Sequence, residues 1–437
     1  MYLSTRIDKA MIANGLLFFA YFLMLVWVNN SYAWFLYEYL GATPKDVDVG
    51  FILFLVGLSF LMSLLCGASI SRPGDLVVVL LVLVLVPHAL VLNGANTFAP
   101  GSLPFSGAPL AVLLGITLVG LSNKVHFRRG SDGGDGRRYM PLLAAINVAV
   151  LIFILVKSIG YFSLDYTGQY VRRALARGVF AAGSADGYLA SIGTQAFFPV
   201  LFAWGVFRKS KMFFWLGIAN VLVLWGAFGQ KYPFFVLLLV YLLMTYFRRF
   251  GKIRVSWLLL FAIAFLSLGI IEHEVMGYSY LNDYFVRRAF VVPASLIGVV
   301  DLFSNLHGMN VYSDTLIGFM MGGERSEPLS FQMGSKIFDN PDLNANVNFL
   351  AIAYLQLEYI GVILESLLVG GVVVLLNYLY MRRNATIAIP VALLFATKIL
   401  EQSLLTVMLG SGVFFMLVFL VLISMPSGSA LYKETPS

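Results

Sequence analysis

The sequence predicts an all-α polytopic membrane protein, and three observations support this fold class. First, 60% of the 437 residues are hydrophobic and only 12% are charged, whereas roughly 25% of the residues of a soluble domain are charged. Second, the apolar residues form runs of about 17–25 residues, the length at which a helix spans the hydrocarbon of a bilayer. Third, these runs are continuous and do not alternate with polar residues, which favours helices over a transmembrane β-barrel.

The runs predict twelve membrane spans within a single integral membrane domain, 1–437. Arg6 and Lys9 precede the first span, which has no small-residue cleavage site and is therefore expected to remain as an uncleaved helix. Two further segments, 289–305 and 345–356, are apolar enough to enter the membrane, so 12–14 helices are expected. In chain order, the predicted spans are about 10–29, 50–67, 76–92, 107–123, 140–160, 193–207, 212–229, 233–247, 255–272, 357–380, 386–402 and 404–424.

The lysine and arginine residues predict the orientation of these spans. With the N-terminus inside the cell, 18 of the 29 basic residues fall in short cytoplasmic loops, as the positive-inside rule expects. The net charge of +7 is then explained by topology and does not indicate a nucleic-acid partner. The other eleven fall on the outer side or within the bilayer, where a charged residue needs a functional reason. They are Lys45, Lys157, Arg172, Arg173, Arg177, Lys231, Arg287, Arg288, Arg325, Lys336 and Lys398.

Two sizeable outer loops, 161–192 and 273–347, carry a repeated arginine motif. In each loop an aromatic residue lies two positions before an arginine pair, and an alanine follows the pair directly. A glycine lies eleven positions after the first arginine, where it can permit a turn or a close approach of the backbone to a ligand. The arginine pairs and their glycines are Arg172 and Arg173 with Gly183, and Arg287 and Arg288 with Gly298.

Arginine suits phosphate binding because its planar guanidinium presents two donors to two oxygens. Arg172, Arg173 and Arg177 lie near one helical face if their segment is helical. Two such clusters can clamp one pyrophosphate, or hold a donor and an acceptor side by side. The alternative is that the arginines anchor the loops to lipid headgroups or pair with acids in the same loops. Those acids are Asp165, Asp283 and Asp301.

Other charged residues have both a structural and a functional interpretation. Lys231 lies in a short outer turn, where it can contact a phosphate or a lipid headgroup. Lys398 and Glu401 are three residues apart and can form an ion pair with each other. The single cysteine, Cys66, and the four scattered histidines have no metal-ligand spacing. No metal and no cofactor are therefore expected.

The two arginine motifs resemble those of the Wzy-type O-antigen polymerases. That family carries arginine-x10-glycine motifs in its third and fifth periplasmic loops, and the two motifs of this chain match them. The resemblance extends over the whole chain. Its most specific segments are Arg172 to Gly183, GTQAFFP at 193–199, WGAFGQKYP at 225–233, LNDYF at 281–285, Arg287 to Gly298, and 397–410.

This resemblance implies a GT-C-like glycosyltransferase in a bacterial inner (cytoplasmic) membrane, with its active site facing the periplasm. The implied reaction is an inverting, metal-independent transfer that joins oligosaccharide repeat units linked to undecaprenyl pyrophosphate. A growing glycan is passed en bloc to the non-reducing end of one lipid-linked unit. The implied partners are therefore a lipid-linked glycan donor and acceptor, membrane lipid, and a protein that regulates chain length.

The implied reaction builds negative charge on the leaving pyrophosphate, and fixed cations in a water-poor site stabilise such charge. On this basis Arg172 and Arg287 are expected to be catalytic. Arg173, Arg177 and Arg288 are expected to support them in binding the substrate, as are Lys231 and the two motif glycines.

A general base for the acceptor hydroxyl is expected among the outer acids. Glu327, in a mixed-charge cluster with Arg325, and Asp342 are the favoured residues. Asn346 and Asn348 lie in the amide-rich run that Asp342 opens, and they suit sugar hydroxyls, although a capped loop before a helix explains that run equally well. The further candidates for the base are Asp314, Asp339, Glu324 and His307.

Two other functions remain open. A lipid-linked oligosaccharide flippase or other transporter would distribute charges through its spans, whereas the unexplained charges here concentrate in outer loops. An O-antigen ligase would differ in its acceptor, a lipid A core. Ligases carry a histidine-asparagine pair ten residues before a Gly-x-x-Gly sequence, and here the comparable residues are Val347, Asn348 and Glu358 to Gly361. The histidine and the first glycine are absent, which argues against the ligase.

Overall fold

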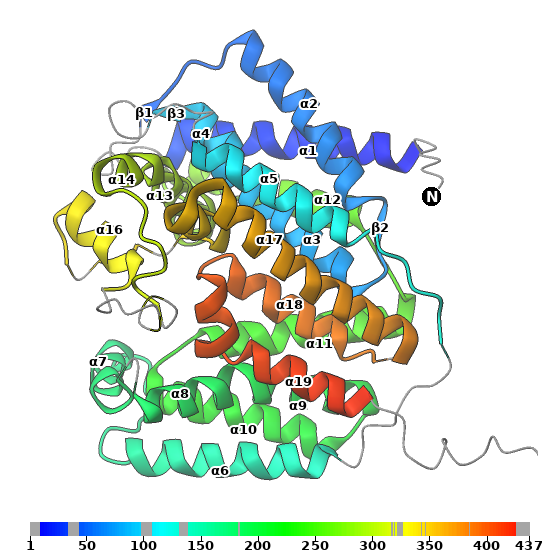
Figure 1. Cartoon of the computed structure of the whole chain (residues 1–437), viewed down its shortest axis with the longest axis vertical. Helices are drawn as coiled ribbons and strands as arrows, with labels where there is room; N and C mark the ends of the chain where they lie inside the picture. The colour runs from blue at the N-terminus through cyan, green and yellow to red at the C-terminus, as the bar shows by residue number, and fades with distance from the viewer. Residues whose placement is uncertain are drawn as a thin grey trace, which may run out of the picture.

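The computed structural model is a helical bundle, in which most helices run across the view of Figure 1 and are joined at its left and right ends. Within the residues that the structure describes, ten helices are long and apolar enough to cross a membrane, and three shorter apolar helices accompany them. The prediction of an all-α polytopic membrane protein is confirmed at this level. The described residues are 9–33, 43–97, 107–130, 139–181, 184–315, 318, 320, 327–341, 343–345, 347–383 and 385–424.

The helices include several π-helical segments, written η, which continue or connect α-helices. In chain order the helical elements are α1 (Lys9–Val28), η1 (Asn29–Ala33), α2 (Val49–Cys66), α3 (Pro73–Val86), η3 (Pro87–Val91), α4 (Leu92–Ala95), α5 (Gly107–Ser122), α6 (Met140–Ser158), α7 (Gln169–Val179), α8 (Ala185–Ile192), η5 (Gly193–Phe197), α9 (Phe198–Arg208), α10 (Lys211–Phe228), α11 (Tyr232–Phe250), α12 (Val255–Met276), η6 (Asn282–Val291), α13 (Val292–Gly298), α14 (Val300–His307), α16 (Leu329–Phe338), α17 (Phe349–Arg383), α18 (Ala388–Ile399), η7 (Thr406–Gly410) and α19 (Val413–Ser424).

Short antiparallel strand pairs tie the connections together at each end of the bundle. β1 (Thr43–Pro44) pairs with β3 (Asn96–Thr97) at one end. β2 (Ser69–Ile70) pairs with β4 (Ile253–Arg254) at the other. In Figure 1 the first pair lies at the left and β2 at the right, so each pair marks the side on which its flanking helices begin or end.

Three of the predicted spans contain only a short apolar helix of fewer than 18 residues. α5 has 16 residues, and α18 and α19 have 12 each. The span expected at 404–424 is divided, because the backbone of Gly412 has a φ of +71° between η7 and α19. That left-handed conformation, which glycine adopts without strain, cannot continue a right-handed helix.

α17 is a helical hairpin and not one continuous helix. Leu357 and Glu358 have non-helical backbone angles, and Glu358 has a φ of +47°. Leu350 and Ser366, one from each arm, both lie against Gly115 of α5. The first arm, 349–356, is buried along its whole length. The segment 345–356, predicted to enter the membrane, is therefore followed by a sharp reversal that precedes the long arm of α17.

Several further helical segments gather at the end that holds β1 and β3. In Figure 1 α7, α13, α14 and α16 all lie at this left end. The stretch Asn282–His307 is long and apolar enough to cross a membrane. It packs on η1, η3 and α4, which follow the ends of α1 and α3, and it also contacts α5, α12 and α17. The described residues of 161–192 and 273–347, expected as outer loops, thus include α7, α13, α14 and α16 at one end of the bundle. However, Ala185–Ile192 and His273–Met276 belong to the candidate membrane spans Ala185–Arg208 and Val255–Met276.

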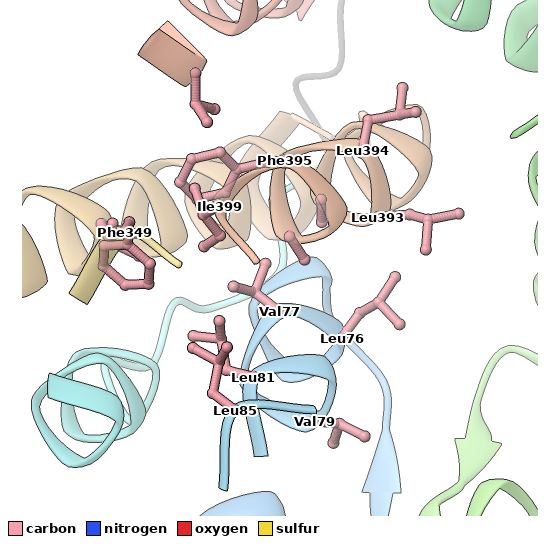
Figure 2. Packing of buried hydrophobic residues seen from close by; sticks show 14 of the residues in the cluster. Leu76, Val77, Val79, Leu81, Leu85, Phe349, Leu393, Leu394, Phe395 and Ile399 are labelled. Atoms are coloured by element: carbon pink, nitrogen blue, oxygen red, sulfur yellow. The ribbon is translucent and has the colours of Figure 1, made fainter. Parts of the chain in front are cut away.

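α3 is the most buried of the long apolar helices, and it lies between α5, α17 and α18. Figure 2 shows Leu76, Val77 and Leu81 of α3 facing residues of α17 and α18. The partners include Phe349 and Phe395, which are fully buried. This apolar contact fixes the three helices that run between the two polar ends of the molecule.

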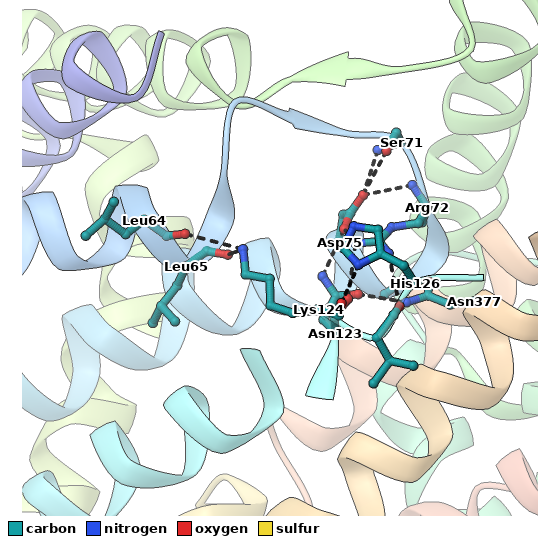
Figure 3. A network of polar contacts seen from close by, with 11 residues as sticks. Leu64, Leu65, Ser71, Arg72, Asp75, Asn123, Lys124, His126 and Asn377 are labelled. Carbon is teal, nitrogen blue, oxygen red and sulfur yellow. Dashed lines mark hydrogen bonds and ion pairs between the residues drawn. The ribbon is translucent and has the colours of Figure 1, made fainter. Parts of the chain in front are cut away.

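A buried polar network joins α3, α5 and α17 at the end that holds β2 (Figure 3). The Asp75 carboxylate accepts from Arg72 at 2.9 Å and from Nδ2 of Asn123 at 2.9 Å. Oδ1 of Asn123 accepts from Asn377 at 2.8 Å, and Asn377 in turn accepts from the backbone N–H of Gly74 at 2.9 Å. Each of these groups forms a hydrogen bond within the network, and the network therefore holds the three helices together.

Candidate active site: a cationic cavity between two arginine segments

α7 carries the first arginine cluster and begins after a turn organised by Asp165. The Asp165 carboxylate accepts from the backbone N–H of Gly168 at 3.2 Å and from the hydroxyl of Thr167. The segment that carries this cluster is helical. Its helical phase separates the arginines, because Arg172 is buried whereas Arg173 and Arg177, four residues apart, share a face.

Arg172 holds the turn before α7 against α10. Only 3% of the residue is exposed, and its guanidinium donates to the backbone carbonyl of Asp165. It also lies over the ring of Trp225, 5.4 Å from the ring centroid, and Trp225 donates to the carbonyl of Leu164 at 2.9 Å. Arg172, expected to be catalytic, thus lies in the protein interior, where it supports α7.

Arg173 reaches the turn at the end of α10. Its Nε and one terminal nitrogen donate to the carbonyl of Gly229 at 3.1 and 3.0 Å. Gly229 has a φ of +60°, and a Cβ at this position would lie 2.5 Å from the carbonyl oxygen of Gln169. A glycine is therefore required here, both by its backbone conformation and by the close approach of α7.

The second arginine pair lies in η6, and its two members differ in the same way. Nε of Arg287 lies 2.9 Å from the Asp283 carboxylate, one turn earlier in the same segment. Tyr278 donates to that carboxylate at 2.6 Å, which raises the pKa of Tyr278 to about 12 because the bond favours the protonated phenol. Arg288 is exposed and points to the cavity that Arg173 and Arg177 line.

η6 is seated on the bundle by contacts on both sides of the arginine pair. The amide of Asn282 donates to the carbonyl of Gly269 at 3.2 Å, and a Cβ at Gly269 would lie 2.3 Å from that side chain. His88 of η3 contacts the carbonyl of Ala289, and Asn93 donates to the carbonyl of Ala294 at 3.0 Å. The position of Arg288 is therefore fixed by contacts of η6 and α13 with α12 and with the η3–α4 segment.

A cavity of about 780 Å³ lies between α7, α8, η5, η6 and the turns that follow α10 and α18. Arg177 and Arg288 form no ion pair within the described residues, where the ion pairs are Arg72 with Asp75, Lys157 with Asp186, and Arg287 with Asp283. The cavity therefore presents cationic groups that the described protein does not neutralise. Its polar lining consists of Arg173, Arg177, Ser191, Thr194, Gln195, Gln230, Arg288 and Glu401.

A second cavity of about 270 Å³ adjoins the first and shares Thr194, Gln195, Gln230 and Glu401 with it. Most of its remaining wall is apolar and comes from the interiors of four helices. These residues are Phe198, Pro199, Leu224, Pro233, Val236 and Leu394. Lys398 also lines it and lies over the Tyr232 ring, 4.4 Å from the centroid. Together the two cavities offer a cationic compartment beside an apolar one.

Glu401 is the only carboxylate among the described residues that line the larger cavity. It is exposed, and it follows α18 in the turn before η7. The pairing with Lys398 that the spacing allows does not occur among the described ion pairs. A carboxylate facing three arginines across an open cavity can accept a proton from a ligand that the arginines bind.

Several predicted site residues lie away from this cavity. Lys231 donates to the phenol of Tyr166 at 2.8 Å, and this contact lowers the pKa of Tyr166. Glu327 is exposed and precedes α16. Asn348 is buried, and its side chain accepts from the backbone N–H groups of residues 350 and 351, so it caps the first arm of α17. Gly298 is buried at the end of α13.

The remaining candidates divide between structural positions and positions that are not described. Asp314 accepts from Asn310, Gln356 and the backbone of Leu329. Asp339 ends α16, and His307 ends α14 beside a phenylalanine ring. The predicted residues that lie outside the described part of the chain are Gly183, Glu324, Arg325, Asp342 and Asn346.

The residues that sequence reasoning missed are Gln195, Gln230 and Glu401. The two glutamines lie in segments that the resemblance singled out, and Gln195 sits in the π-helical η5, a conformation common at functional sites. The spacing of Glu401 from Lys398 suggests only an ion pair between them. A carboxylate just beyond the end of an apolar helix is the signal that points to Glu401.

Comparison of the chain with protein-family models, with curated proteins and with solved structures finds no match. Within the described residues, no group of three or more histidines, cysteines or carboxylates is placed to hold a metal ion. The polar groups that the cavity offers to a ligand are arginines, amides, hydroxyls and one carboxylate.

Proposed function

We propose that the chain is a Wzy-type O-antigen polymerase, which joins undecaprenyl-pyrophosphate-linked oligosaccharide repeat units by inverting glycosyl transfer. The observation that carries this proposal is the convergence of α7 and η6 on one cavity. Their arginines, Arg173, Arg177 and Arg288, come from segments more than 100 residues apart in sequence, yet they line the same space. Such an arrangement suits a ligand with several phosphate oxygens.

In the proposed reaction the arginines bind the pyrophosphate of the donor. The bond between its anomeric carbon and the pyrophosphate oxygen breaks, and the electron pair leaves with the pyrophosphate. Fixed guanidinium groups stabilise this developing charge without having to reorganise. The acceptor hydroxyl attacks the opposite face of the anomeric carbon, which inverts it, and passes its proton to Glu401.

The adjoining apolar cavity supports a lipid-linked substrate. Phe198, Leu224 and Leu394 line a space that shares a polar rim with the cationic compartment. A prenyl pyrophosphate is likewise divided into a charged head and an apolar chain, which are joined at one phosphate. The amide groups of Gln195 and Gln230 lie on that shared rim, where they suit the hydroxyl groups of the first sugar.

The proposal includes an orientation in the bacterial inner membrane. α7, which lines the cavity, lies at the end that holds β1 and β3 in Figure 1, and β2 and the basic connection that carries β4 lie at the other end. By the positive-inside rule, the cavity faces the periplasm. In this topology Asn282–His307 lies on the outer end and α17 crosses once, through its long arm. The membrane is then crossed twelve times, in a GT-C-like architecture.

The test is complementation of a bacterium whose own copy of this gene has been deleted. Wild-type chain, Arg288→Ala and Arg173→Ala are expressed to equal levels, and lipopolysaccharide is examined on gels. We expect wild-type chain to restore a ladder of repeats, and each variant to leave core carrying one repeat. Arg382→Gln, at the far end of the bundle, serves as the matched control and should ladder normally.

The other outcomes separate the rival functions. If single repeats fail to reach the core while polymer accumulates on lipid in the deletion strain, the chain is a ligase. If repeats never reach the outer side in that strain, it is a flippase. Normal ladders in both arginine variants would remove the arginine cavity from the reaction.

A further inference from the structure

The end of the bundle opposite the arginine cavity holds a second cationic cavity, which we call the basic groove. It has a volume of about 620 Å³ and lies where the α9–α10 turn meets the last turn of α11. Its cationic residues are Lys209, Lys211, Arg248 and Arg249. All four are exposed.

The geometry of the α9–α10 turn brings these charges together. A Cβ at Gly205 would lie 2.6 Å from the backbone nitrogen of Phe214, so α9 and α10 pack backbone against backbone. The turn between them is closed by Lys209, whose φ of +55° lies in the left-handed region that residues other than glycine rarely adopt. Lys209 and Lys211 are thereby held beside the end of α11.

The described protein does not neutralise this groove. The sequence contains no aspartate or glutamate between Asp186 and Glu272, so α9, α10 and α11 supply no acid. Within the described residues the ion pairs involve none of the four cations. Helix dipoles favour Arg248 and Arg249 at the end of α11, but they disfavour Lys211 at the first position of α10. The groove is therefore open to an external anion.

The surroundings of the groove identify the source of that anion as a lipid. Trp215 and Tyr241 line it and are 63% and 43% exposed, and these residue types concentrate at the level of lipid headgroups. On α11, on either side of Tyr241 in sequence, Leu238 and Leu242 are also about half exposed. These leucines form an apolar surface on which acyl chains can lie, directly below the cations.

We propose that the basic groove binds the phosphate headgroup of an anionic phospholipid, of the phosphatidylglycerol or cardiolipin class. The phosphate lies among Lys211, Arg248 and Arg249, and the acyl chains lie along the exposed face of α11. This site is separate from the arginine cavity, and its occupancy is expected whether or not the chain transfers sugars.

The experiment is lipid retention by the purified full chain in nanodiscs of phosphatidylcholine doped with cardiolipin or phosphatidylglycerol, read by native mass spectrometry. Wild-type chain should retain the anionic lipids and not phosphatidylcholine. The triple variant Lys211→Gln/Arg248→Gln/Arg249→Gln should bind them about a hundredfold more weakly, because each cation near a membrane surface contributes roughly fivefold. The matched control, Arg382→Gln/Arg383→Gln, removes two cations of α17 that lie outside the groove, and it should bind as the wild type does.

A second variant guards against a change of topology in the triple variant. Thr245→Trp fills the groove while keeping all four cations, and it should also lose the lipid. Equal retention by the triple variant and the control would overturn the proposal, as would unchanged binding in Thr245→Trp. Displacement of the lipid by millimolar inorganic phosphate would assign the groove to a free anion and would equally overturn it.

Discussion

The arginine cavity and the Asp75 network are built from the same kinds of side chain at opposite ends of the bundle, and they differ in how those side chains are satisfied. In the network Asp75, Arg72, Asn123 and Asn377 are bonded to one another. In the cavity Arg177 and Arg288 have no such partners among the described residues. Matched polar groups hold helices together, whereas unmatched ones are available for a ligand.

Glu401→Gln should have the largest effect, because it removes the proposed proton acceptor while keeping the shape of the side chain. Turnover of lipid-linked repeats by purified chain is expected to fall by about 10²–10⁴. The melting temperature should stay unchanged, since Glu401 is exposed. Normal turnover in this variant would leave the cavity as a binding site without a base.

Arg288→Ala is expected to lower turnover by about 10²–10³, the cost of removing one stabilising donor from a developing anion. Its neighbour is the control. Arg287→Ala removes a partly exposed ion pair with Asp283 and should cost about 0.5–1 kcal/mol of stability. Turnover and thermal unfolding are measured for both variants side by side. A loss of turnover in Arg287→Ala with normal turnover in Arg288→Ala would contradict the assignment of Arg288 to the cavity.

Asp75→Ala should act on stability and not on the reaction. It leaves Asn123 and Arg72 without their shared acceptor, and we expect a loss of about 3 kcal/mol, because a broken buried pair leaves an uncompensated charge. Denaturation in detergent measures the loss. Turnover per folded molecule should match the wild type, and a specific fall in turnover would show that the two ends are coupled.

The smallest expected effect is on the titration of Tyr278. Its phenol donates to Asp283, which raises its pKa to about 12. In Asp283→Asn the acceptor carries no charge, so the pKa should fall toward the usual value of about 10. NMR of tyrosine labelled at the ring carbon that bears oxygen follows this directly. An unchanged pKa would mean that Asp283 does not hold Tyr278 in solution.

The sequence was sufficient for the apolar helices, because hydropathy is a property of each segment by itself. It also identified the two arginine segments, since their charges do not fit the orientation rule. It could not show which arginine of each pair lines the cavity. Which arginine lines the cavity depends on the helical phase of α7 and on the π-helical winding of η6. A shift of η6 by one residue about its axis would put Arg287 in the position that Arg288 occupies.

The remaining features required three-dimensional contacts. Glu401 joins the cavity only because the turn after α18 packs near η5 and η6. The reversal in α17 falls at Leu357 and Glu358, neither of which is a residue that signals a turn. Packing of both arms against α5 stabilises this backbone conformation, and no local sequence pattern predicts it.

The buried first arm of α17 has a consequence for how the chain is assembled during synthesis. Its eight residues, 349–356, extend only about 12 Å as a helix, less than half of the roughly 30 Å of hydrocarbon. The insertion machinery cannot place such a piece as a span of its own. Because the arm packs against α5 and, at Ala353 and Gly361, against the long arm that follows it, the arm can settle only after the long arm has been made. Assembly of this part of the protein therefore ends with an earlier segment docking on the helix that follows it.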